Sequence, residues 1–380
     1  MTLLGYELRK LFRLPALWVF LALCLALNFM LIFSSEYGLP FFNETSETAS
    51  VLGQRVDEDF VAGLGEIPQT ENGDILAGAV AGMTDTFDDF DVDSLSQYYE
   101  SMVAESPTAV RWMQSKYEKL SARIAELAES NASLDLYAGP MTHDSHQFLF
   151  GTLLRAISAE SCILAALAVL YLFGYEKLNR TELTACVSRT GRRLWRTKTA
   201  AGILAALAML LLLAAVSLGV YFSLWDYSGV WSANVSSGFN YIEDVLMVKP
   251  FITWGNLSVA GYLSAALALI AAMTVISSLV SAITGTLIQN TYVAALALLL
   301  ICAGGFTLLS AFADLKLWAA YEISAFLPVT LWTTQSIWFT ESGVSSILPW
   351  QETITAALDL LLFACFTGLA LRRFYRKDIA

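Results

Sequence analysis

Histidine and cysteine are scarce in this chain, and their positions exclude several kinds of site. Only His143 and His146 occur among 380 residues, so separate parts of the chain cannot supply a Ser/His/Asp or Cys/His catalytic arrangement. The five cysteines, at positions 24, 162, 186, 302 and 365, offer neither a disulfide framework nor a zinc-binding spacing. The phosphate-binding pattern G-x-x-x-x-G-K-[ST] is also missing. No cofactor, metal ion or intrinsic catalytic activity is therefore expected.

Charged residues are scarce as well, and acidic and basic residues lie in different segments of the chain. Charged residues make up 15% of the chain, against about 25% in ordinary soluble domains, while hydrophobic residues reach 56%. Residues 34–147 hold 21 Asp and Glu but only 5 Lys and Arg, a net charge of −16 in a chain whose total is −12. The remainder is slightly basic. Nucleic-acid binding is not expected, because the only segment large enough to form a soluble domain is strongly acidic.

Most of the positive charge lies in three short stretches, each beside a hydrophobic run long enough to cross a bilayer. Basic flanks stay in the cytoplasm, so this pattern predicts both membrane residence and orientation. Both termini are expected to be cytoplasmic in a multi-pass protein of the cell membrane, and residues 34–147 extracytoplasmic. The three stretches hold Arg9, Lys10 and Arg13; then Lys177, Arg180, Arg189, Arg192, Arg193, Arg196 and Lys198; and finally Arg372, Arg373, Arg376 and Lys377.

The hydrophobic runs predict an all-α polytopic membrane protein with six transmembrane helices. The first run, Pro15–Phe33, has 19 residues and would cover roughly 28 Å, which is too long for a typical signal peptide core. The expected spans are residues 14–33, 148–174, 199–224, two within 253–313, and 351–371. Polar residues near 284–291 divide the charge-free run 251–313 into two spans joined by a tight cytoplasmic turn.

The segments between the spans have predicted roles too. Residues 34–147 are expected to form a mostly helical extracytoplasmic domain, residues 175–198 a basic cytoplasmic loop and residues 225–252 an outer loop. Residues 314–350 contain a short charge-free piece with Pro328, which predicts a broken, re-entrant pair of helices before the sixth span. Residues 372–380 form a cytoplasmic tail.

Two helices outside the spans can be predicted from local pattern. Residues 1–13 form an amphipathic helix that either lies in the cytoplasmic interface or extends the first span. A second helix begins at Ser106-Pro107, with Ser as its cap and Pro at its first position. Its apolar seam either pairs with a partner helix or packs on its own domain, and Gly139-Pro140 ends the pattern. The seam consists of Val110, Met113, Tyr117, Leu120, Ile124 and Leu127.

Four features together resemble the permease subunit of an ATP-binding cassette transporter of the type-2 exporter class. These are the amphipathic start Tyr6–Phe12, the cytoplasmic stretch FGYEKLNRTELTACVSRTGRRLWRTK at 173–198, the neutral turn between the fourth and fifth spans, and the broken segment before the sixth. The resemblance covers most of the chain outside 34–147.

This resemblance implies a mechanism without catalysis by the chain itself. The basic loop would form a coupling helix that docks in a cleft of a separate ATPase subunit, and a second permease copy or a paralogue would complete the transporter within the lipid bilayer. The residues implied in docking are Glu176, Thr181, Arg189, Arg192, Arg193, Arg196 and Lys198. The alternative is that the basic residues only set topology and contact anionic lipid head groups.

Glu160 and Asp359 are carboxylates inside predicted spans, which makes them candidates for a transport path. They could equally be paired, Glu160 with Arg155 for example, or wetted near an interface. Two weaker patterns lie outside the membrane. Asp89, Asp91, Asp93 and Glu100 match part of a calcium loop that lacks its glycine, so a solvated acidic loop is favoured. His143 and His146 are too few for a metal site.

A second class of function remains open. The chain could be a membrane sensor or scaffold protein whose extracytoplasmic domain binds a ligand. That reading predicts no ATPase partner.

Overall fold

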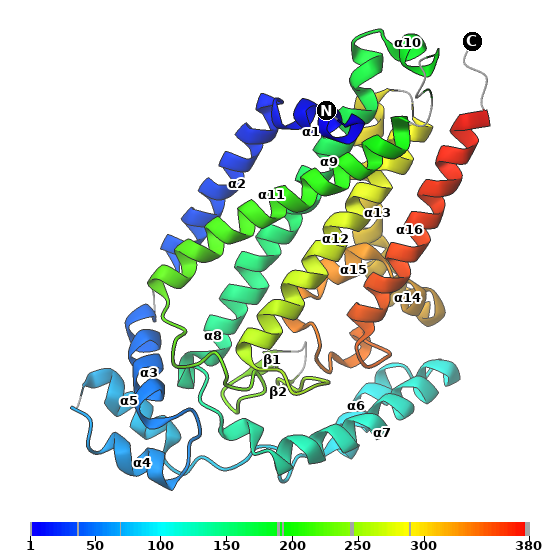
Figure 1. Cartoon of the computed structure of the whole chain (residues 1–380). Coiled ribbons are helices and arrows are strands. Elements are labelled where there is room, and N and C mark those ends of the chain that lie inside the picture. The colour runs from blue at the N-terminus through cyan, green and yellow to red at the C-terminus, as the bar shows by residue number, and fades with distance from the viewer. Residues whose placement is uncertain are drawn as a thin grey trace.

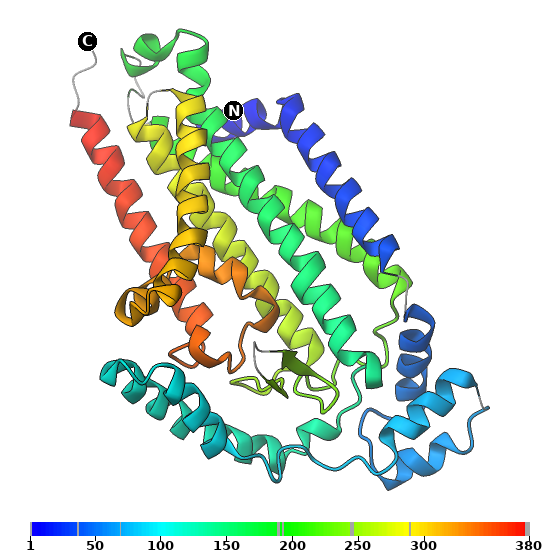
Figure 2. The ribbon, with the colours of Figure 1, turned by 180° about the vertical axis from the view of Figure 1, so that it is seen from behind.

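The computed structural model describes residues 2–35, 38–68, 70–187, 191, 194–243, 247–288 and 290–376. Within these ranges the chain forms a bundle of long helices, with shorter helices at both of its ends (Figures 1 and 2). Helix α1 (Leu3–Phe12) and the last residues of α16 (Gln351–Arg376) lie at the same end of the bundle, which we call the terminal end. The other we call the opposite end.

Among the described residues, six helices are long and apolar enough to cross a membrane. They are α2 (Pro15–Ser34), α9 (Leu154–Leu178), α11 (Leu194–Leu224), α12 (Val259–Leu287), α13 (Thr291–Asp314) and α16. The predicted fold class is confirmed at this level, as a helical protein with six apolar helices. The expected turn between the fourth and fifth spans falls between α12 and α13.

Several helices extend beyond the predicted spans. Helix α11 begins at Leu194 rather than at residue 199, because Leu194 and Trp195 are buried and continue its packed face. Lys198 therefore lies inside a long helix and not in a loop. Before α9, the chain runs through α8 (Thr142–His146) and a π-helical stretch, Gln147–Leu153, which lengthen this span at the opposite end.

Helix α9 is the centre of the bundle and packs against both α11 and α12. A small residue permits one of these close approaches. A methyl group at Gly202 of α11 would lie 2.6 Å from a methyl carbon of Val169 on α9, so only glycine fits there. On its other side α12 packs against α16, where the Thr367 hydroxyl lies 3.4 Å from the carbonyl oxygen of Leu279.

Helix α13 lies at the edge of the bundle and shows the apolar surface expected of a lipid-facing helix. Tyr292, Leu296, Leu299 and Leu300 are all more than half exposed. An apolar face of this extent is costly in water. In a bilayer it carries no such cost, because lipid tails are as apolar as leucine.

Helix α1 is a separate helix and not an extension of α2. The Thr2 hydroxyl caps its first turn. The helix ends at Phe12, and Arg13 and Leu14 are not helical, before Pro15 begins α2. Leu11 is buried and Arg9 exposed, as the amphipathic pattern predicts, whereas the Lys10 side chain, expected beside Arg9 on the polar face, is largely buried. Figure 1 shows α1 lying across the terminal end of the bundle.

Five helices form the acidic segment at the opposite end. They are α3 (Leu39–Leu52), α4 (Glu58–Leu64), α5 (Glu71–Val80), α6 (Val92–Met102) and α7 (Pro107–Glu129). Short 3-10 turns follow at Ala132–Leu134 and Gly139–Met141. A small antiparallel ladder of β1 (Tyr241–Glu243) and β2 (Val248–Pro250) lies between this layer and the bundle (Figure 1).

Helix α7 begins where the sequence predicts and ends earlier. The Ser106 hydroxyl accepts a hydrogen bond from the backbone N–H of Ala109 at 3.3 Å, as a cap should. The seam packs within this layer, mainly against α6. The helix stops at Glu129, ten residues before Gly139, because Asn131 takes a left-handed backbone conformation.

Two short helices, α14 (Trp318–Ser324) and α15 (Pro328–Thr333), lie between α13 and α16 in the chain. Pro328 begins α15, so the proline interrupts the segment as expected. Two 3-10 turns at Gln335–Ile337 and Gly343–Ser345 lead into α16.

Candidate functional site

The hairpin that joins α9 to α11 begins with a well-defined helix end. Arg180 adopts a left-handed conformation with φ of 55°. Its N–H donates to the carbonyl of Lys177 at 3.1 Å, and the N–H of Thr181 donates to the carbonyl of Glu176 at 2.8 Å. This pair of bonds is the Schellman motif, which satisfies the last carbonyls of a helix. It turns the chain sharply into α10 (Glu182–Val187).

At the base of this hairpin a group of charged side chains is buried among α1, α9 and α11. We call Glu7, Lys10, Glu176 and Lys198 the terminal-end cluster. Lys10 Nζ donates to Glu7 Oε1 at 2.8 Å and to Glu176 Oε1 at 3.1 Å. Lys198 Nζ bonds to the other carboxylate oxygen of Glu176 and to the carbonyl of Leu172.

The terminal-end cluster is electrically balanced and closed to solvent. Two lysines face two glutamates, and all four side chains are at least nine-tenths buried. The ammonium group of Lys10 also lies 4.4 Å from the ring centre of Tyr175, a cation–π contact. Because a buried charge without a partner is costly, this pairing fixes α1 and α11 against the end of α9.

Helix α10 is held away from the bundle by this base. Figure 1 shows it beyond the terminal end, next to the last turns of the long helices. Leu183 is 63% exposed and Val187 is 84% exposed, so two apolar side chains cover little of the protein itself. A projecting helix with exposed apolar residues is the form that a docking element takes. Sequence reasoning, which followed the basic residues, did not single out these two.

The predicted docking residues divide into three groups. Glu176 and Lys198 are buried and paired with each other, so they hold the hairpin in place. Thr181 is exposed at the start of α10, and Arg196 is exposed with its guanidinium 5.5 Å from the ring of Tyr375. Arg189, Arg192 and Arg193 lie outside the described residues. Contact with a partner stays a prediction for all of them.

Glu160 lies within α9 and bonds to α2 rather than to Arg155. Its Oε2 accepts a hydrogen bond from Asn28 Nδ2 at 2.9 Å, and the same amide group donates to the Ser217 hydroxyl of α11 at 3.1 Å. Arg155 instead donates to the carbonyl of Thr333 at 2.7 Å. Glu160 Oε1 is buried without a hydrogen-bond partner, so one side of this carboxyl is unsatisfied.

Asp359 occupies a different part of the bundle. It lies on α16, is 5% exposed, and its Oδ2 is buried without a hydrogen-bond partner. The spacing of three and four residues places it on the same face of α16 as Glu352 and Thr355. The two intramembrane carboxylates that the sequence singles out therefore belong to separate surroundings, one among α2, α9 and α11 and the other on α16.

A second buried charge group lies at the opposite end. We call Lys116, Lys249 and Glu341 the distal cluster. Lys116 Nζ donates to Glu341 Oε1 at 2.9 Å and to the carbonyls of Gly343 and Ser346 at 2.7 and 3.1 Å. Lys249 Nζ pairs with Glu341 Oε2. The distal cluster joins α7 and β2 to the segment that leads into α16.

Glu341 is the centre of the distal cluster. Its carboxylate also accepts hydrogen bonds from the Tyr117 hydroxyl at 3.0 Å and from the Gly343 N–H at 2.7 Å. Burial alone would raise the pKa of Glu341, but the charges of Lys116 and Lys249 outweigh it and hold that pKa well below its usual value of 4.5. The carboxylate is therefore ionised over the whole physiological range. No sequence pattern pointed to this cluster.

The weaker candidates have structural explanations. Asp91 caps α6, because its Oδ1 accepts from the Ser94 N–H at 2.9 Å and its Oδ2 from the Ser94 hydroxyl at 2.5 Å. These bonds to Ser94 lower the pKa of Asp91. His146 is fully buried among aromatic rings, and His143 stacks on Tyr241. Within the part of the chain that the structure describes, no three His, Cys, Asp or Glu side chains gather into a metal-binding group.

No protein-family model matches the sequence, and no curated protein or solved structure is similar enough to match it. A proposal of function therefore rests on the chain's own residues and their arrangement.

Proposed function

We propose that the chain is the membrane-spanning permease subunit of an ATP-driven exporter of the ATP-binding cassette type-2 class. The observation that carries this proposal is the hairpin of α9, α10 and α11. Its base is locked by the ion pairs of Glu176 with Lys10 and Lys198, and its tip presents Leu183 and Val187 to a partner. A rigid base and an apolar tip suit an element that receives movement from another protein.

Charge supports a cytoplasmic position for the terminal end. Arg9, Arg13, Arg372 and Arg373 are exposed there, and basic residues beside spans stay on the cytoplasmic side. The acidic layer of α3 to α7 would then lie outside the cytoplasm. In this orientation α14 and α15 form the re-entrant segment on the outer side, since neither is long enough to cross a bilayer.

The proposal also requires other subunits. Because the sequence has no phosphate-binding loop, ATP hydrolysis belongs to a separate ATPase subunit. A second copy or a paralogue supplies the other half of the path. Glu160 and Asp359, each with an unsatisfied buried oxygen, are the candidates to meet a transported group.

Co-purification tests the proposal. The tagged chain, extracted from its native membrane, is expected to retain a protein that carries a phosphate-binding loop and hydrolyses ATP. Replacing Leu183 and Val187 together by Asp is expected to abolish this association without lowering the unfolding temperature, because both side chains are already exposed. Val51→Asp is the matched control, since Val51 is 70% exposed but lies on α3 at the opposite end. An ATPase that stays bound to the double variant would reject α10 as the docking element.

One observation favours the alternative of a sensor or scaffold. The distal cluster links α7 of the acidic layer to residues 341–346, which lead into α16, and this is a route by which ligand binding outside could move a membrane helix. Under this alternative no ATPase accompanies the chain, and a ligand of the acidic layer alters labelling at the terminal end. The same co-purification therefore separates the two functions.

A further inference from the structure

One cation inside an apolar helix has no acidic partner. Arg155 is the second of the 25 residues of α9, and among the described residues no Asp or Glu forms an ion pair with it. Within the same part of the chain, its guanidinium makes a single hydrogen bond, from Nη2 to the carbonyl of Thr333 at 2.7 Å. Its Nε is buried without an acceptor. Because a charge in apolar surroundings is normally paired, Arg155 indicates an anion that the chain itself does not supply.

Arg155 borders a surface of α9 that faces lipid. Arg155, Ala159 and Ile163 follow one another at a spacing of four residues, so they lie on one face of the helix. Ile163 is 47% exposed, and Arg155 itself is partly exposed. On the other side of Arg155, the exposed ring of Phe306 on α13 contacts the ring of Trp332 on α15. An anion can therefore reach the guanidinium from the lipid.

The position of Arg155 along α9 matches the depth of lipid phosphates. A helix of 25 residues spans roughly 37 Å, against roughly 30 Å for the hydrocarbon core of a bilayer. Because Leu178 ends α9 at the terminal end, Arg155 lies near the boundary of the hydrocarbon at the opposite end. Its guanidinium carbon lies 4.7 Å from the ring centre of Trp332, and tryptophan is enriched at this depth. The long arginine side chain can extend from there to the phosphate layer.

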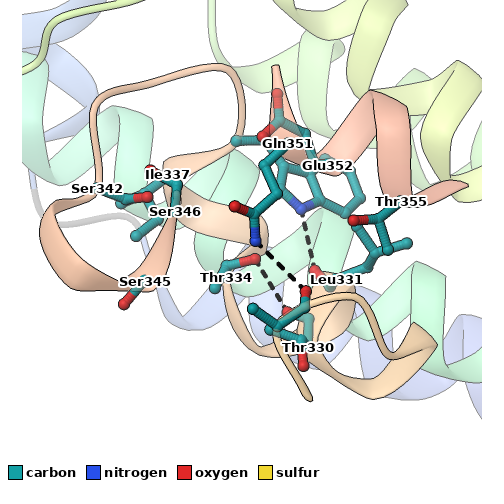
Figure 3. Close-up of a pocket in the computed structure, with 12 residues that line it drawn as sticks. Thr330, Leu331, Thr334, Ile337, Ser342, Ser345, Ser346, Gln351, Glu352 and Thr355 are labelled. Atoms are coloured by element: carbon teal, nitrogen blue, oxygen red, sulfur yellow. Dashed lines mark hydrogen bonds between the residues drawn. The ribbon is translucent and has the colours of Figure 1, made fainter. Parts of the chain in front are cut away.

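A purely structural role for Arg155 would be to hold α15 against α9. The backbone of Arg155 already contributes to this, because its carbonyl accepts a hydrogen bond from Trp332 Nε1 at 3.1 Å. Figure 3 shows a further bond that holds α15, from Trp338 Nε1 to the carbonyl of Leu331 at 3.0 Å. Helix α15 also packs against α13 and α16. The contacts of α15 therefore do not require a positive charge at position 155.

The surroundings favour a lipid phosphate over a dissolved anion. Residues 34–147, which lie at the same end of the bundle, carry a net charge of −16 and repel free anions. A lipid phosphate needs no long-range attraction, because the membrane already supplies it beside α9. The planar guanidinium suits phosphate oxygens, which it binds through two parallel N–H groups.

We propose that Arg155 binds the phosphate group of a phospholipid in the leaflet at the opposite end of the bundle. The N–H groups that Thr333 does not use supply the hydrogen bonds, and stacking on Trp332 holds the guanidinium in place. The apolar face around Ile163 contacts the acyl chains. Both zwitterionic and anionic phospholipids carry this phosphate, so the site takes either. The inference concerns binding alone and stands whether or not the chain associates with an ATPase.

The test is native mass spectrometry of the purified full chain in detergent, which counts bound lipids by their mass. Three probes are titrated separately: a phosphatidylglycerol, a diacylglycerol with the same acyl chains, and inorganic phosphate. We expect the phosphatidylglycerol to bind at a lower concentration than the diacylglycerol, and inorganic phosphate not to be retained. Equal binding of the two lipids would overturn the proposal. Inorganic phosphate retained as well as the lipid would indicate a site for a free anion and would also overturn it.

Three variants assign the binding to this site. Arg155→Gln removes the charge and is expected to weaken the affinity for one phospholipid roughly tenfold or more. Trp332→Phe keeps the charge and an aromatic ring, and is expected to retain that phospholipid. Arg111→Gln is the matched control, because Arg111 is an exposed arginine of α7 whose side chain bonds only to the Pro107 carbonyl among the described residues.

Arg155→Lys keeps the proposal testable if Arg155→Gln fails to fold. Lysine retains the charge but loses the paired planar donors, so the affinity is expected to fall while the preference for phosphatidylglycerol over diacylglycerol remains. Loss of that preference in folded Arg155→Lys would contradict the proposal. So would an unchanged phospholipid affinity in Arg155→Gln, which a purely structural role predicts, or an equal loss in Arg111→Gln.

Discussion

The two ends of the bundle each bury lysine against glutamate, but with different charge balance. The terminal-end cluster has two glutamates for two lysines, and Glu176 and Lys10 each have two charged partners. The distal cluster has one glutamate for two lysines, so every ion pair in it passes through Glu341.

The two clusters should therefore differ in how much stability is lost when one of their charged residues is replaced. At the terminal end, loss of Lys198 still leaves Glu176 paired with Lys10 and Lys10 paired with Glu7. At the opposite end, loss of Glu341 strands two buried ammonium groups at once. We therefore expect the loss of Lys198 at the terminal end to cost less stability than the loss of Glu341 at the opposite end.

The largest expected effect is that of Glu341→Gln. Breaking a buried pair by removing one partner typically costs about 3–5 kcal/mol, because the remaining charge stays buried. Unfolding followed by intrinsic fluorescence in detergent would measure it. The control is Glu105→Gln, which breaks an exposed pair with Lys316 and is expected to cost about 0–1 kcal/mol. Equal costs for the two variants would refute a structural role for Glu341.

Lys198→Met should have a smaller effect. It removes the bonds to Glu176 and Leu172, yet Glu176 keeps Lys10. Loss of a hydrogen bond to a charged group costs roughly 1.5–3 kcal/mol. The same fluorescence assay is expected to place this variant between Glu341→Gln and Glu105→Gln. A cost above that of Glu341→Gln would reverse the proposed ranking of the two clusters.

Acid should weaken the distal cluster through Glu341. Its pKa in the folded chain lies below 4.5, so the ionised carboxylate contributes stability that is fully present above that pH. This contribution is lost progressively as the pH falls below 4.5 toward the folded value. The difference in stability between wild type and Glu341→Gln is therefore expected to be constant above that range and to shrink below it. A difference that grows on acidification would contradict the assignment.

The smallest effect is expected for Ser106→Ala. This change removes the cap of α7, the helix that carries Lys116, and leaves the distal cluster itself intact. Loss of such a cap typically costs about 1 kcal/mol. Thermal unfolding of the variant, compared with that of Ser101→Ala on α6, would measure the stability that the Ser106 cap contributes. A loss as large as that of Glu341→Gln would show that α7, rather than the cluster, dominates the stability of this end.

The sequence predicts what depends on local pattern. Long apolar runs identify the six apolar helices, Pro15 and Pro328 begin helices, and Ser106 caps α7. Lys198 shows the limit of such reasoning. Lys198 is one of seven basic residues between two spans, a pattern that predicts docking. The fold instead buries it against Glu176, which lies 22 residues earlier in the chain.

Contacts between distant segments could not be predicted at all. Glu160 has a basic residue five positions earlier, yet it bonds to Asn28, 132 residues away, because α2 packs beside α9. Lys116 and Glu341 lie 225 residues apart, and no periodicity connects them.

The most direct test of this account is to determine on which side of the membrane α10 lies. In a chain whose native cysteines are replaced, Val187→Cys and Val51→Cys would each be labelled with a membrane-impermeant thiol reagent on intact and on permeabilised cells. The account predicts that position 51 reacts on intact cells and position 187 only after permeabilisation. Labelling of position 187 on intact cells would place the hairpin outside, where no ATP-driven subunit could reach it.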